Sequence, residues 1–588
     1  MKKDIQKIIK NAIEKLQKEG KFSDFKIPEI KIDCPSDKKF GDYSSNIAMV
    51  LAGVVKEEPM EIAASVKQQA LSSKCEEISK IEIVKPGYIN FYLSEKYLQD
   101  LVGIINNEKE SFGNSKIGKR KKVMVEYSQP NTHKEFHIGH LRNVFIGSSL
   151  VNVLRKAGFK VLAANYIGDT GTHIAKCLWG IKKFHSDENL DDIKNKAQFL
   201  GKVYSEAAKA ISENSEYENE FKRLQQNFEK RDKQLIKLWE KTKQWSLKEF
   251  QKIYDELGVS FDIYFWESEE EIAGKKMLPE LLKKGIAKES EGAIIADLEK
   301  YNLRILVLLR KDGSVLYGLK DISLAVKKFK DYKVDRNIII VDVRQDLYFK
   351  QVFKILELMG FKKDMRHIGY DFVSLKGEGM MSSRLGNIVP AKFLMNEIIE
   401  KVKEKFPQTK IEKEIGLGAL KFYMLKYSSS SKIEFNINEA LKLNGATGPY
   451  VQYAHARIAS ILVKSEKLKV KSEKKPPLSS GHLPLEKGER GGNINLNLLV
   501  HEKELDLMRE LNKFPELVEE IARSYETHKL PHYAIKLADK FHSFYAECRV
   551  IDENNSELSL ARQNLINAVR IVLAEVLRLM GVSAPESM

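Results

Sequence analysis

Residues 123–143 read VMVEYSQPNTHKEFHIGHLRN, and this stretch decides how the chain folds. It opens with an apolar run at residues 123–125, of the kind that forms a buried parallel strand. A serine, a proline and an asparagine within residues 128–131 then break the strand and make a loop. Apolar residues follow at roughly helical spacing over residues 144–154. The stretch therefore predicts a strand, a loop and a helix, with two histidines where the loop meets the helix.

The two histidines belong to the string His137-Ile138-Gly139-His140. Doubly wound sheets bind nucleotides at the carboxyl ends of their strands, where a helix N-terminus offers N–H groups to phosphate. Gly139 would let a flat base approach the backbone, and His137 and His140 share one helical face and can donate to phosphate oxygens. Two other interpretations stay open at this point: simple helix-start residues, or two ligands of a metal.

Composition limits the class of protein. The chain has 588 residues, enough for roughly three or four domains. Its net charge of +16 suits a polyanion such as nucleic acid, and equally a lysine-rich solvated surface. The four cysteines are widely scattered, so they predict neither a zinc site nor a disulfide framework, and a reducing compartment fits. No apolar core follows the basic start, and no aliphatic run is long enough to span a bilayer.

The wider string SQPNTHKEFHIGHLRN resembles the HIGH region of class I aminoacyl-tRNA synthetases, and of the arginyl-tRNA synthetase family in particular. Further resemblances lie in FGDYSSNIAMVLA and KPGYINFYLS near the start, and in GATGPYVQYAHARIAS and GVSAPESM towards the end, which suggests a complete chain. They imply a multidomain α/β protein with a Rossmann-like class I catalytic domain. The expected divisions are a small N-terminal α+β domain that meets the tRNA elbow (1–113), the catalytic domain (114–440) with a helical insertion (about 178–258), and an all-helical anticodon-binding domain (441–588) with a disordered insertion (about 464–497).

Strand-like runs refine this expectation. In the N-terminal domain two such runs lie near residues 29–32 and 81–84, and the second is followed by the string GYINFYL at residues 87–93. In the catalytic domain they lie at 160–166 and 337–343 after the opening strand, with a strand pair at 292–296 and 304–309 between them.

The second class I loop should fall at residues 377–387, which read GEGMMSSRLGN. This segment resembles the family's KMSKS loop, but Met380 and Ser383 stand where the lysines belong. Many arginyl enzymes share this loss, and a lysine just upstream of the HIGH motif is thought to compensate; Lys134 stands there. By itself the segment could also be an ordinary glycine-rich loop.

The resemblance implies an arginine–tRNA ligase. ATP and L-arginine give arginyl-adenylate and pyrophosphate, and the arginyl group then passes to the terminal adenosine of the tRNA. Negative charge builds on phosphate oxygens in the first step, so the enzyme needs positioned donors there, with Mg²⁺ on the phosphates. The expected catalytic residues are His137, His140, Lys134 and Arg384, and the expected ATP-binding residues are Gly139, Met381, Ser382 and Ser383.

Recognition of arginine needs carboxylates, because the guanidinium group is a rigid fork of donors. Matching the family's motifs puts Glu267, Tyr317 and Asp321 at the guanidinium group. The same matching puts Glu126, Asn131 and Gln345 near the α-amino and carboxylate end. It also puts Tyr450 and Tyr453 at the anticodon, where aromatic rings can stack on unpaired bases, with Arg457 near the tRNA backbone. The alternative for any one acid is a surface charge, and for the two tyrosines it is packing between helices.

Three positions depart from the family's pattern. Tryptophan, glutamine and histidine are usual where Thr170, His173 and Tyr348 stand, so these three are given no role, and only Asp169 and the neighbouring glycines are carried over. The altered 377–387 loop leaves a non-catalytic tRNA-binding relative as an alternative. Another class I adenylate-forming enzyme is a second alternative, although it would lack the anticodon domain.

The expected partners are tRNA(Arg), L-arginine and ATP with Mg²⁺, without protein-bound zinc and without a membrane. We expect a cytoplasmic monomer, although the sequence itself does not define the oligomeric state. It also does not say whether arginine activation needs tRNA, which the resemblance suggests.

Overall fold

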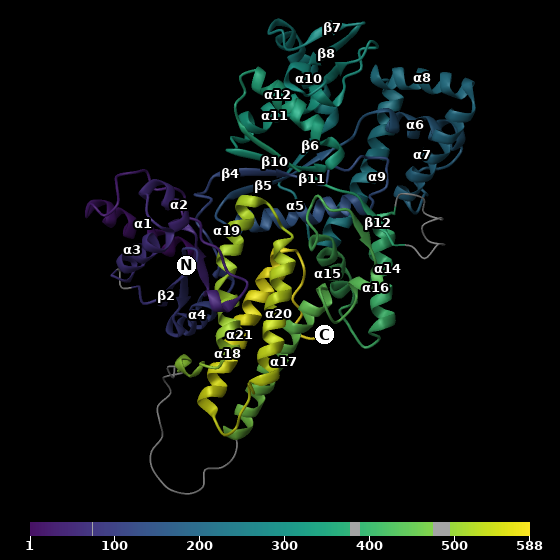
Figure 1. Cartoon of the computed structure of the whole chain (residues 1–588). Helices are drawn as coiled ribbons and strands as arrows, with labels where there is room; N and C mark the ends of the chain where they lie inside the picture. Colours follow the sequence, from purple (N-terminus) through teal and green to yellow (C-terminus); the bar gives the residue numbers. More distant parts are fainter. Residues whose placement is uncertain (73–74, 377–388, 474–493) are drawn as a thin grey trace.

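The computed structural model describes residues 1–72, 75–376, 389–473 and 494–588 (Figure 1). The N-terminal region is a small α+β unit whose three antiparallel strands lie in the order β1-β3-β2. Its elements are α1 (Lys2–Lys18), η1 (Lys38–Phe40), β1 (Tyr43–Ser45), α2 (Ile47–Val55), α3 (Pro59–Leu71), β2 (Ile78–Val84), β3 (Tyr88–Leu93), α4 (Glu95–Glu108) and η2 (Lys109–Ser111).

The strand predicted at residues 29–32 is wrong. Ile30 and Ile32 are buried, which explains the alternating pattern, but the segment forms no strand and is followed by a single bridge between Asp33 and Ser44. The third strand is β1 instead. The run predicted at 81–84 does form a strand, as the end of β2, and the string at 87–93 contains β3.

A five-stranded parallel sheet forms the centre of the catalytic region. Its strands are β4 (Lys122–Glu126), β5 (Lys160–Ile167), β6 (Ile263–Trp266), β10 (Arg336–Asp342) and β11 (Asp364–Tyr370). They lie in the order β11-β10-β4-β5-β6, so the chain starts in the middle, builds outward through β5 and β6, and then returns to the other side of β4. The reversal between β4 and β10 is the switch point at which such sheets bind ligands.

Helices cover both faces of this sheet. In Figure 1, α5 (Ile138–Lys156) lies below the sheet, and α10 (Glu267–Lys283), α11 (Tyr317–Tyr332) and α12 (Asp346–Leu358) lie above it. Leu324 and Phe329 of α11 pack with Met124, Ala164 and Phe265 of the strands. Burial on both faces explains why the strands read as continuous apolar runs.

Two insertions interrupt the central sheet. Four helices between β5 and β6 form the predicted helical arm: α6 (Thr172–Phe184), α7 (Lys196–Glu213), α8 (Ser215–Glu229) and α9 (Lys233–Leu257). Between α10 and α11 lies an antiparallel sheet of β7 (Lys288–Ser290), β8 (Ala293–Asp297) and β9 (Ile305–Leu309), with η3 (Glu299–Tyr301) between the last two. The strand pair predicted at 292–296 and 304–309 is therefore confirmed.

The rest of the chain is mostly helical. A parallel pair of short strands, β12 (Val373–Leu375) and β13 (Ile433–Phe435), accompanies α14 (Ala391–Lys405), α15 (Glu412–Leu425) and α16 (Ile437–Ala440). The C-terminal helices are α17 (Gly448–Glu473), α18 (Glu502–Asn512), α19 (Phe514–Ser524), α20 (Lys529–Glu547) and α21 (Ser556–Leu579), with η5 (Leu496–Leu498) before α18. None of the helices that the structure describes is long and apolar enough to cross a bilayer.

The predicted start of the insertion, at residue 464, is too early. Helix α17 continues to Glu473, since lysine and glutamate are favourable residues in a helix. Residues 474–493 of the predicted insertion lie outside the described residues.

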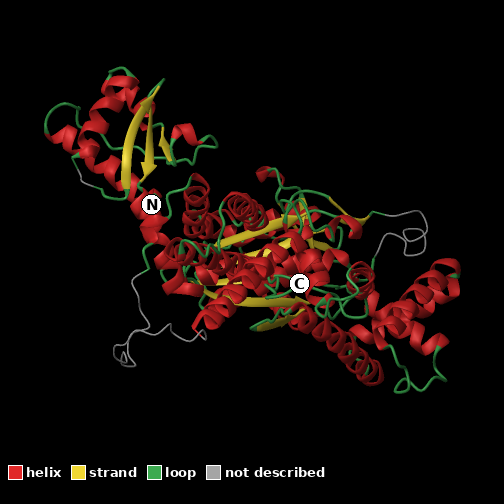
Figure 2. Cartoon of the chain, turned by 90° about the horizontal axis from the view of Figure 1, so that it is seen from below, coloured by secondary structure: helices red, strands yellow, loops and turns green. Residues whose placement is uncertain are grey.

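The N-terminal unit is joined to the C-terminal helices by a chain of hydrogen bonds. Tyr97 Oη donates to Asn512 Oδ1 (2.8 Å), Asn512 Nδ2 donates to Tyr43 Oη (2.9 Å), and Tyr43 Oη donates to Glu516 Oε1 (3.0 Å). Arg509 adds an ion pair to Asp42 (3.0 Å). Figure 2 shows the N-terminal strands as a lobe apart from the central sheet. These bonds tie that lobe to α18 and α19.

Candidate active site

The histidine pair lies at the start of α5, beside the switch point of the sheet. His137 is the N-cap of α5, and its Nδ1 accepts a hydrogen bond from the Gly139 N–H (3.1 Å). His140 Nδ1 accepts from the His137 backbone N–H (3.2 Å), and the two ring centroids are 3.8 Å apart. Because both Nδ1 atoms accept, the proton of each neutral ring is on Nε2. Both Nε2–H groups are therefore donors.

Burial keeps these rings neutral. It lowers the pKa of His137 to about 4, with the nearby charges of Lys134 and Arg344 contributing, and it lowers the pKa of His140 well below its usual range. The expectation that the histidines donate to phosphate stands as a hypothesis, but they would do so as neutral donors and not as cations.

Lys134 contributes positive charge near this helix start. Its side chain is exposed in the loop before α5, its Nζ lies 5.8 Å from the centroid of the Tyr204 ring, and partial burial lowers its pKa. A Cβ atom at Gly139 would lie 3.0 Å from His137 Cε1, so an added methyl group would crowd the ring. The other three predicted ATP-binding residues, Met381, Ser382 and Ser383, and the predicted catalytic Arg384 lie outside the described residues.

The acids predicted at the guanidinium group lie together over the carboxyl end of the sheet. Glu267 is the first residue of α10 and is 3% exposed. Lys320 Nζ lies 3.0 Å from Glu267 Oε1 and 3.2 Å from Glu271 Oε2. Burial raises the pKa of Glu267, and Lys320 opposes the rise. For Lys320, burial acts to lower the pKa, but Glu267 and Glu271 together raise it above its usual value. The Glu267 carboxylate is therefore already paired with a cation of the protein itself, Lys320.

Asp321 stands one residue further along α11 and has a different partner. Tyr348, from the first turn of α12, donates a short hydrogen bond to Asp321 Oδ2. Burial raises the pKa of Asp321 to about 7 even though this bond favours the carboxylate. The carboxyl group is thus poised between its charged and neutral forms at neutral pH.

Glu126 ends β4 and is also engaged. Its Oε2 lies 2.5 Å from Lys328 Nζ of α11, both side chains being buried, and its Oε1 accepts from Gln129 Nε2 (2.8 Å). Asn131 forms a bridge with Gly168, where a Cβ atom would lie 2.1 Å from Asn131 Oδ1. A glycine is therefore required at that position.

Tyr317 and Gln345 are the exposed members of the predicted arginine-binding set. Tyr317 begins α11 and is 58% exposed, and its ring centroid lies 5.7 Å from Lys320 Nζ. Gln345 is the exposed N-cap of α12. Gln345 follows the carboxyl end of β10 by three residues. Tyr317 lies close enough to Glu267 and Asp321 that, after burial, their charges help to raise its pKa.

Three partners in this region escaped prediction: Lys320, Lys328 and Tyr348. Lys320 and Lys328 lie on an amphipathic helix, and the sequence pattern gives no reason to expect its lysines to be buried. Their burial becomes evident only in the structure, where each contacts a buried acid. Tyr348 was given no role because the family usually has histidine there. A tyrosine hydroxyl can donate a hydrogen bond to a carboxylate as histidine can. This shared ability is the feature from which a role for Tyr348 could have been predicted.

Asp169 anchors the loop that precedes α6. Its carboxylate accepts from the N–H and Oγ of Ser268 (2.8 Å each) and pairs with Lys243 (2.5 Å). Beyond it, His173 Nε2 is buried without a hydrogen-bond partner among the described residues, and burial lowers its pKa to about 3. Asp169 therefore holds the start of α10, including Glu267, in place.

The three residues predicted at the anticodon lie on α17. Tyr450 Oη donates to Asp539 Oδ1 (2.6 Å), and the guanidinium carbon of Arg457 lies 4.4 Å from the centroid of the Tyr545 ring, so both side chains face α20. Tyr453 is 39% exposed. Of the two tyrosines, Tyr453 has the ring that is accessible to a base.

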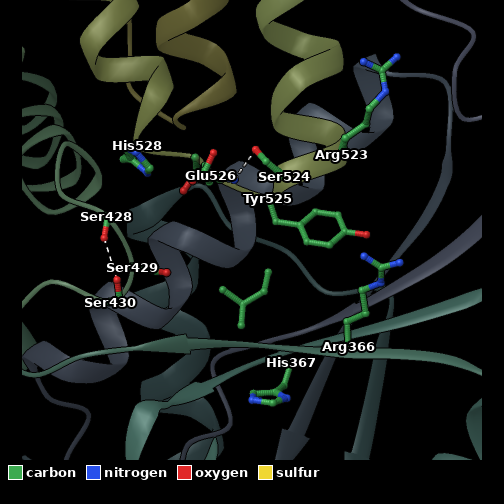
Figure 3. Close-up of a pocket in the computed structure, with 12 residues that line it drawn as sticks. Arg366, His367, Ser428, Ser429, Ser430, Arg523, Ser524, Tyr525, Glu526 and His528 are labelled. Atoms are coloured by element: carbon green, nitrogen blue, oxygen red, sulfur yellow. Dashed lines mark hydrogen bonds between the residues drawn. The ribbon is translucent and has the colours of Figure 1, made fainter. Parts of the chain in front are cut away.

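A cavity of about 400 Å³ lies between the edge strand β11 and the turn that joins α19 to α20 (Figure 3). Figure 3 shows the Tyr525 ring reaching across it towards Arg366, while His367 points away below the strand. Arg366 is paired with Asp364 (3.1 Å), and Arg523 with Glu519 (3.1 Å). None of the residues that line this cavity belongs to the predicted site residues. Within the described ranges, no three histidine, cysteine, aspartate or glutamate side chains gather as a metal site would require.

Family models match three parts of the chain. The catalytic domain of class I (R) tRNA synthetases matches residues 101–435, the DALR anticodon binding domain matches 451–588, and the arginyl tRNA synthetase N-terminal domain matches 3–93. Together with the parallel sheet and the histidine pair at its switch point, these matches define a class I aminoacyl-tRNA synthetase. The predicted fold class is confirmed.

Individual relatives narrow the class further. An arginine–tRNA ligase from Bdellovibrio bacteriovorus is 33% identical over 573 residues, which is 94% of this chain and 93% of the relative. One from Clostridium acetobutylicum is 32% identical over 598 residues, with both chains fully covered. The Thermus thermophilus arginyl-tRNA synthetase structure has a TM-score of 0.79 at 25% identity, with full coverage of both chains. The chain belongs to the arginyl-tRNA synthetase family.

Proposed function

We propose that ATP and L-arginine react in the crevice between the start of α5 and the starts of α10, α11 and α12. As a member of its family, the chain is an arginine–tRNA ligase with tRNA(Arg), arginine and ATP as substrates. The observation that carries the location is the juxtaposition of two neutral histidine donors at a helix N-terminus with an acidic pocket at the same edge of the sheet.

In this proposal His137 and His140 donate from Nε2 to phosphate oxygens, where charge builds during adenylation. Gly139 leaves room for the adenine base. Lys134 supplies fixed positive charge, together with Arg384 of the 377–387 loop, whose Met381, Ser382 and Ser383 contact ATP. Mg²⁺ bound to the phosphates would neutralise part of their charge, since phosphate oxygens suit this ion.

The guanidinium group lies against Asp321 and Glu267, with Tyr317 beside it. Lys320 keeps Glu267 charged in a buried position, and Tyr348 orients Asp321. Glu126, Asn131 and Gln345 lie towards the α-amino and carboxylate end, where Lys328 holds the Glu126 carboxylate in place. A buried cation needs opposite charge, and this pocket supplies two carboxylates for it.

For tRNA we propose that residues 1–113 meet the elbow and that residues 441–588 read the anticodon, with Tyr453 stacking on a base and Tyr450 and Arg457 supporting that surface. The catalytic domain then spans 114–440. We further propose a monomer, and a cytoplasmic location, which suits a family that serves protein synthesis.

Pyrophosphate exchange tests the proposal. Each amino acid is tried with ATP, with and without tRNA(Arg). We expect exchange with arginine alone among the amino acids, and little of it until the tRNA is added. Exchange with another amino acid, or none with arginine and tRNA together, would contradict the proposed site. Full exchange without RNA would contradict the dependence on tRNA, but it would not contradict the proposed site.

A further inference from the structure

Tyr166 is the penultimate residue of β5 and faces the arginine pocket. Successive strand residues point to opposite faces of a sheet. Asn165 points to the α5 side, where its Nδ2 donates to Tyr254 Oη (3.0 Å). Tyr166 points to the opposite side and packs against the cluster that includes Met124 and Phe265. Its hydroxyl therefore lies at the carboxyl end of β5, on the face that α11 covers.

The hydroxyl group of Tyr166 is buried and has no hydrogen-bond partner among the described residues. Other enclosed tyrosines differ in this respect: Tyr254 bonds Ser128 and Asn165, and Tyr348 bonds Asp321. Leaving a buried hydroxyl unpaired costs free energy, so a single unpaired one at a binding site indicates a partner that arrives with a ligand.

The groups around this hydroxyl indicate what that partner is. Burial, and then the charges of Asp321, Glu267 and Glu126 together with Tyr348, raise the pKa of Tyr166 well above its usual range. The hydroxyl therefore stays protonated and lies among the acids assigned to the guanidinium group. A phenol can accept one N–H while it donates its own proton to a carboxylate.

We propose that Tyr166 is a specificity-determining residue of the arginine pocket, whose hydroxyl oxygen accepts a hydrogen bond from the guanidinium group of the substrate. This inference rests on the proposed location of the arginine site. It assigns the planar fork of guanidinium N–H groups a third, uncharged acceptor beside Glu267 and Asp321. An alkylammonium group presents its donors at one point, so lysine would reach fewer of these acceptors.

The experiment compares Tyr166→Phe with Tyr332→Phe, a matched control in which the ring packs in the same cluster at the far end of α11. Tyr166→Phe should raise the Michaelis constant for arginine about tenfold to a hundredfold, and leave that for ATP unchanged. Its ligand-free melting temperature should not fall, because the hydroxyl it loses had no partner. The rise in melting temperature on adding arginine should shrink. Tyr332→Phe should change none of these.

Two results would overturn the proposal. One is an unchanged Michaelis constant for arginine in Tyr166→Phe while Asp321→Asn loses arginine use; the pocket then stands, and Tyr166 is not part of it. The other is a loss of melting temperature in Tyr166→Phe that is equal with and without arginine, which indicates a structural role. If Asp321→Asn also leaves arginine use unchanged, the proposed arginine site itself fails, and the inference with it.

Discussion

Lys320 Nζ lies 3.0 Å from Glu267 Oε1, so a carboxylate that we assign to the substrate's guanidinium group already has a cation beside it. Both side chains are almost completely buried. A buried ion pair is costly to break, because removal of one partner leaves the other charge without compensation. The proposed arginine pocket therefore contains this ion pair before arginine binds, and its stability depends on the pair.

Lys320→Met should destabilise the protein by about 3–5 kcal/mol, since Glu267 loses its counter-ion. Arginine should stabilise this variant more than it stabilises the wild type, because the guanidinium group supplies the missing charge. Thermal unfolding with and without arginine measures both effects. Lys330→Met, at an exposed position of the same helix, is the control and should behave as the wild type. Equal stability of the two variants would contradict the prediction.

Arginine use should depend on pH through Asp321, whose pKa burial raises to about 7. Below that pH the carboxyl group is protonated and loses its attraction for the guanidinium group, so kcat/KM for arginine should fall about tenfold per pH unit. The free protein has the opposite dependence: the raised pKa makes this group's contribution to stability greatest at low pH, and that contribution is lost as pH rises through about 7. Profiles of kcat/KM from pH 5.5 to 8.5 test this. Asp321→Asn should give a low, flat profile; an inflection that persists in this variant rules out Asp321 as its source.

Lys134→Ala should slow adenylation about a hundredfold or more, because Met380 and Ser383 cannot supply the positive charge that Lys134 would carry. Folding should be unaffected, since the side chain is exposed and packs little. Single-turnover formation of adenylate measures the rate. A rate within twofold of the wild type would assign the positive charge to Arg384 alone, with the neutral histidines acting only as hydrogen-bond donors. A lysine placed at Met380 or Ser383 in the Lys134→Ala protein should recover part of the loss.

The two tyrosines of α17 should respond differently to substitution. Tyr453→Ala should weaken binding of tRNA(Arg) by roughly 1–3 kcal/mol, the usual value of one stacked base, with little effect on stability. Tyr450→Phe should instead lower stability by about 1 kcal/mol, because it removes the hydrogen bond to Asp539. Filter binding with tRNA and thermal unfolding separate the two effects. Loss of tRNA binding in Tyr450→Phe and not in Tyr453→Ala would reverse these assignments.

Much of the fold could be predicted because its signals are local. The apolar run at residues 123–125, the turn residues after it and the helical spacing of residues 144–154 each lie within a few positions of one another. They define β4, the loop and α5 before any long-range contact is known. The prediction of a strand at residues 29–32 was wrong because an alternating pattern indicates only that one side of a segment is buried. An extended segment can bury those side chains without pairing with another strand.

The candidate site was less accessible to prediction because its electrostatics join distant parts of the chain. Lys320 meets Glu267 only because α10 and α11 pack together, and Lys328 meets Glu126 only because α11 covers the end of β4. The neutrality of His137 follows from burial, which no local pattern reveals. The missing partner of the Tyr166 hydroxyl is likewise a property of the assembled pocket.

The hydrogen bonds that run from Tyr97 through Asn512 and Tyr43 to Glu516 bear on how this protein can be re-engineered. Half of the groups in that chain come from the first hundred residues and half from beyond residue 500. A chimaera that takes its N-terminal lobe from a distant relative would leave buried polar groups unpaired at the joint, even if each part folds well by itself. Recombination between relatives should therefore succeed when the lobe is exchanged together with α18 and α19. These two parts are encoded near opposite ends of the gene, but they have to be transferred together.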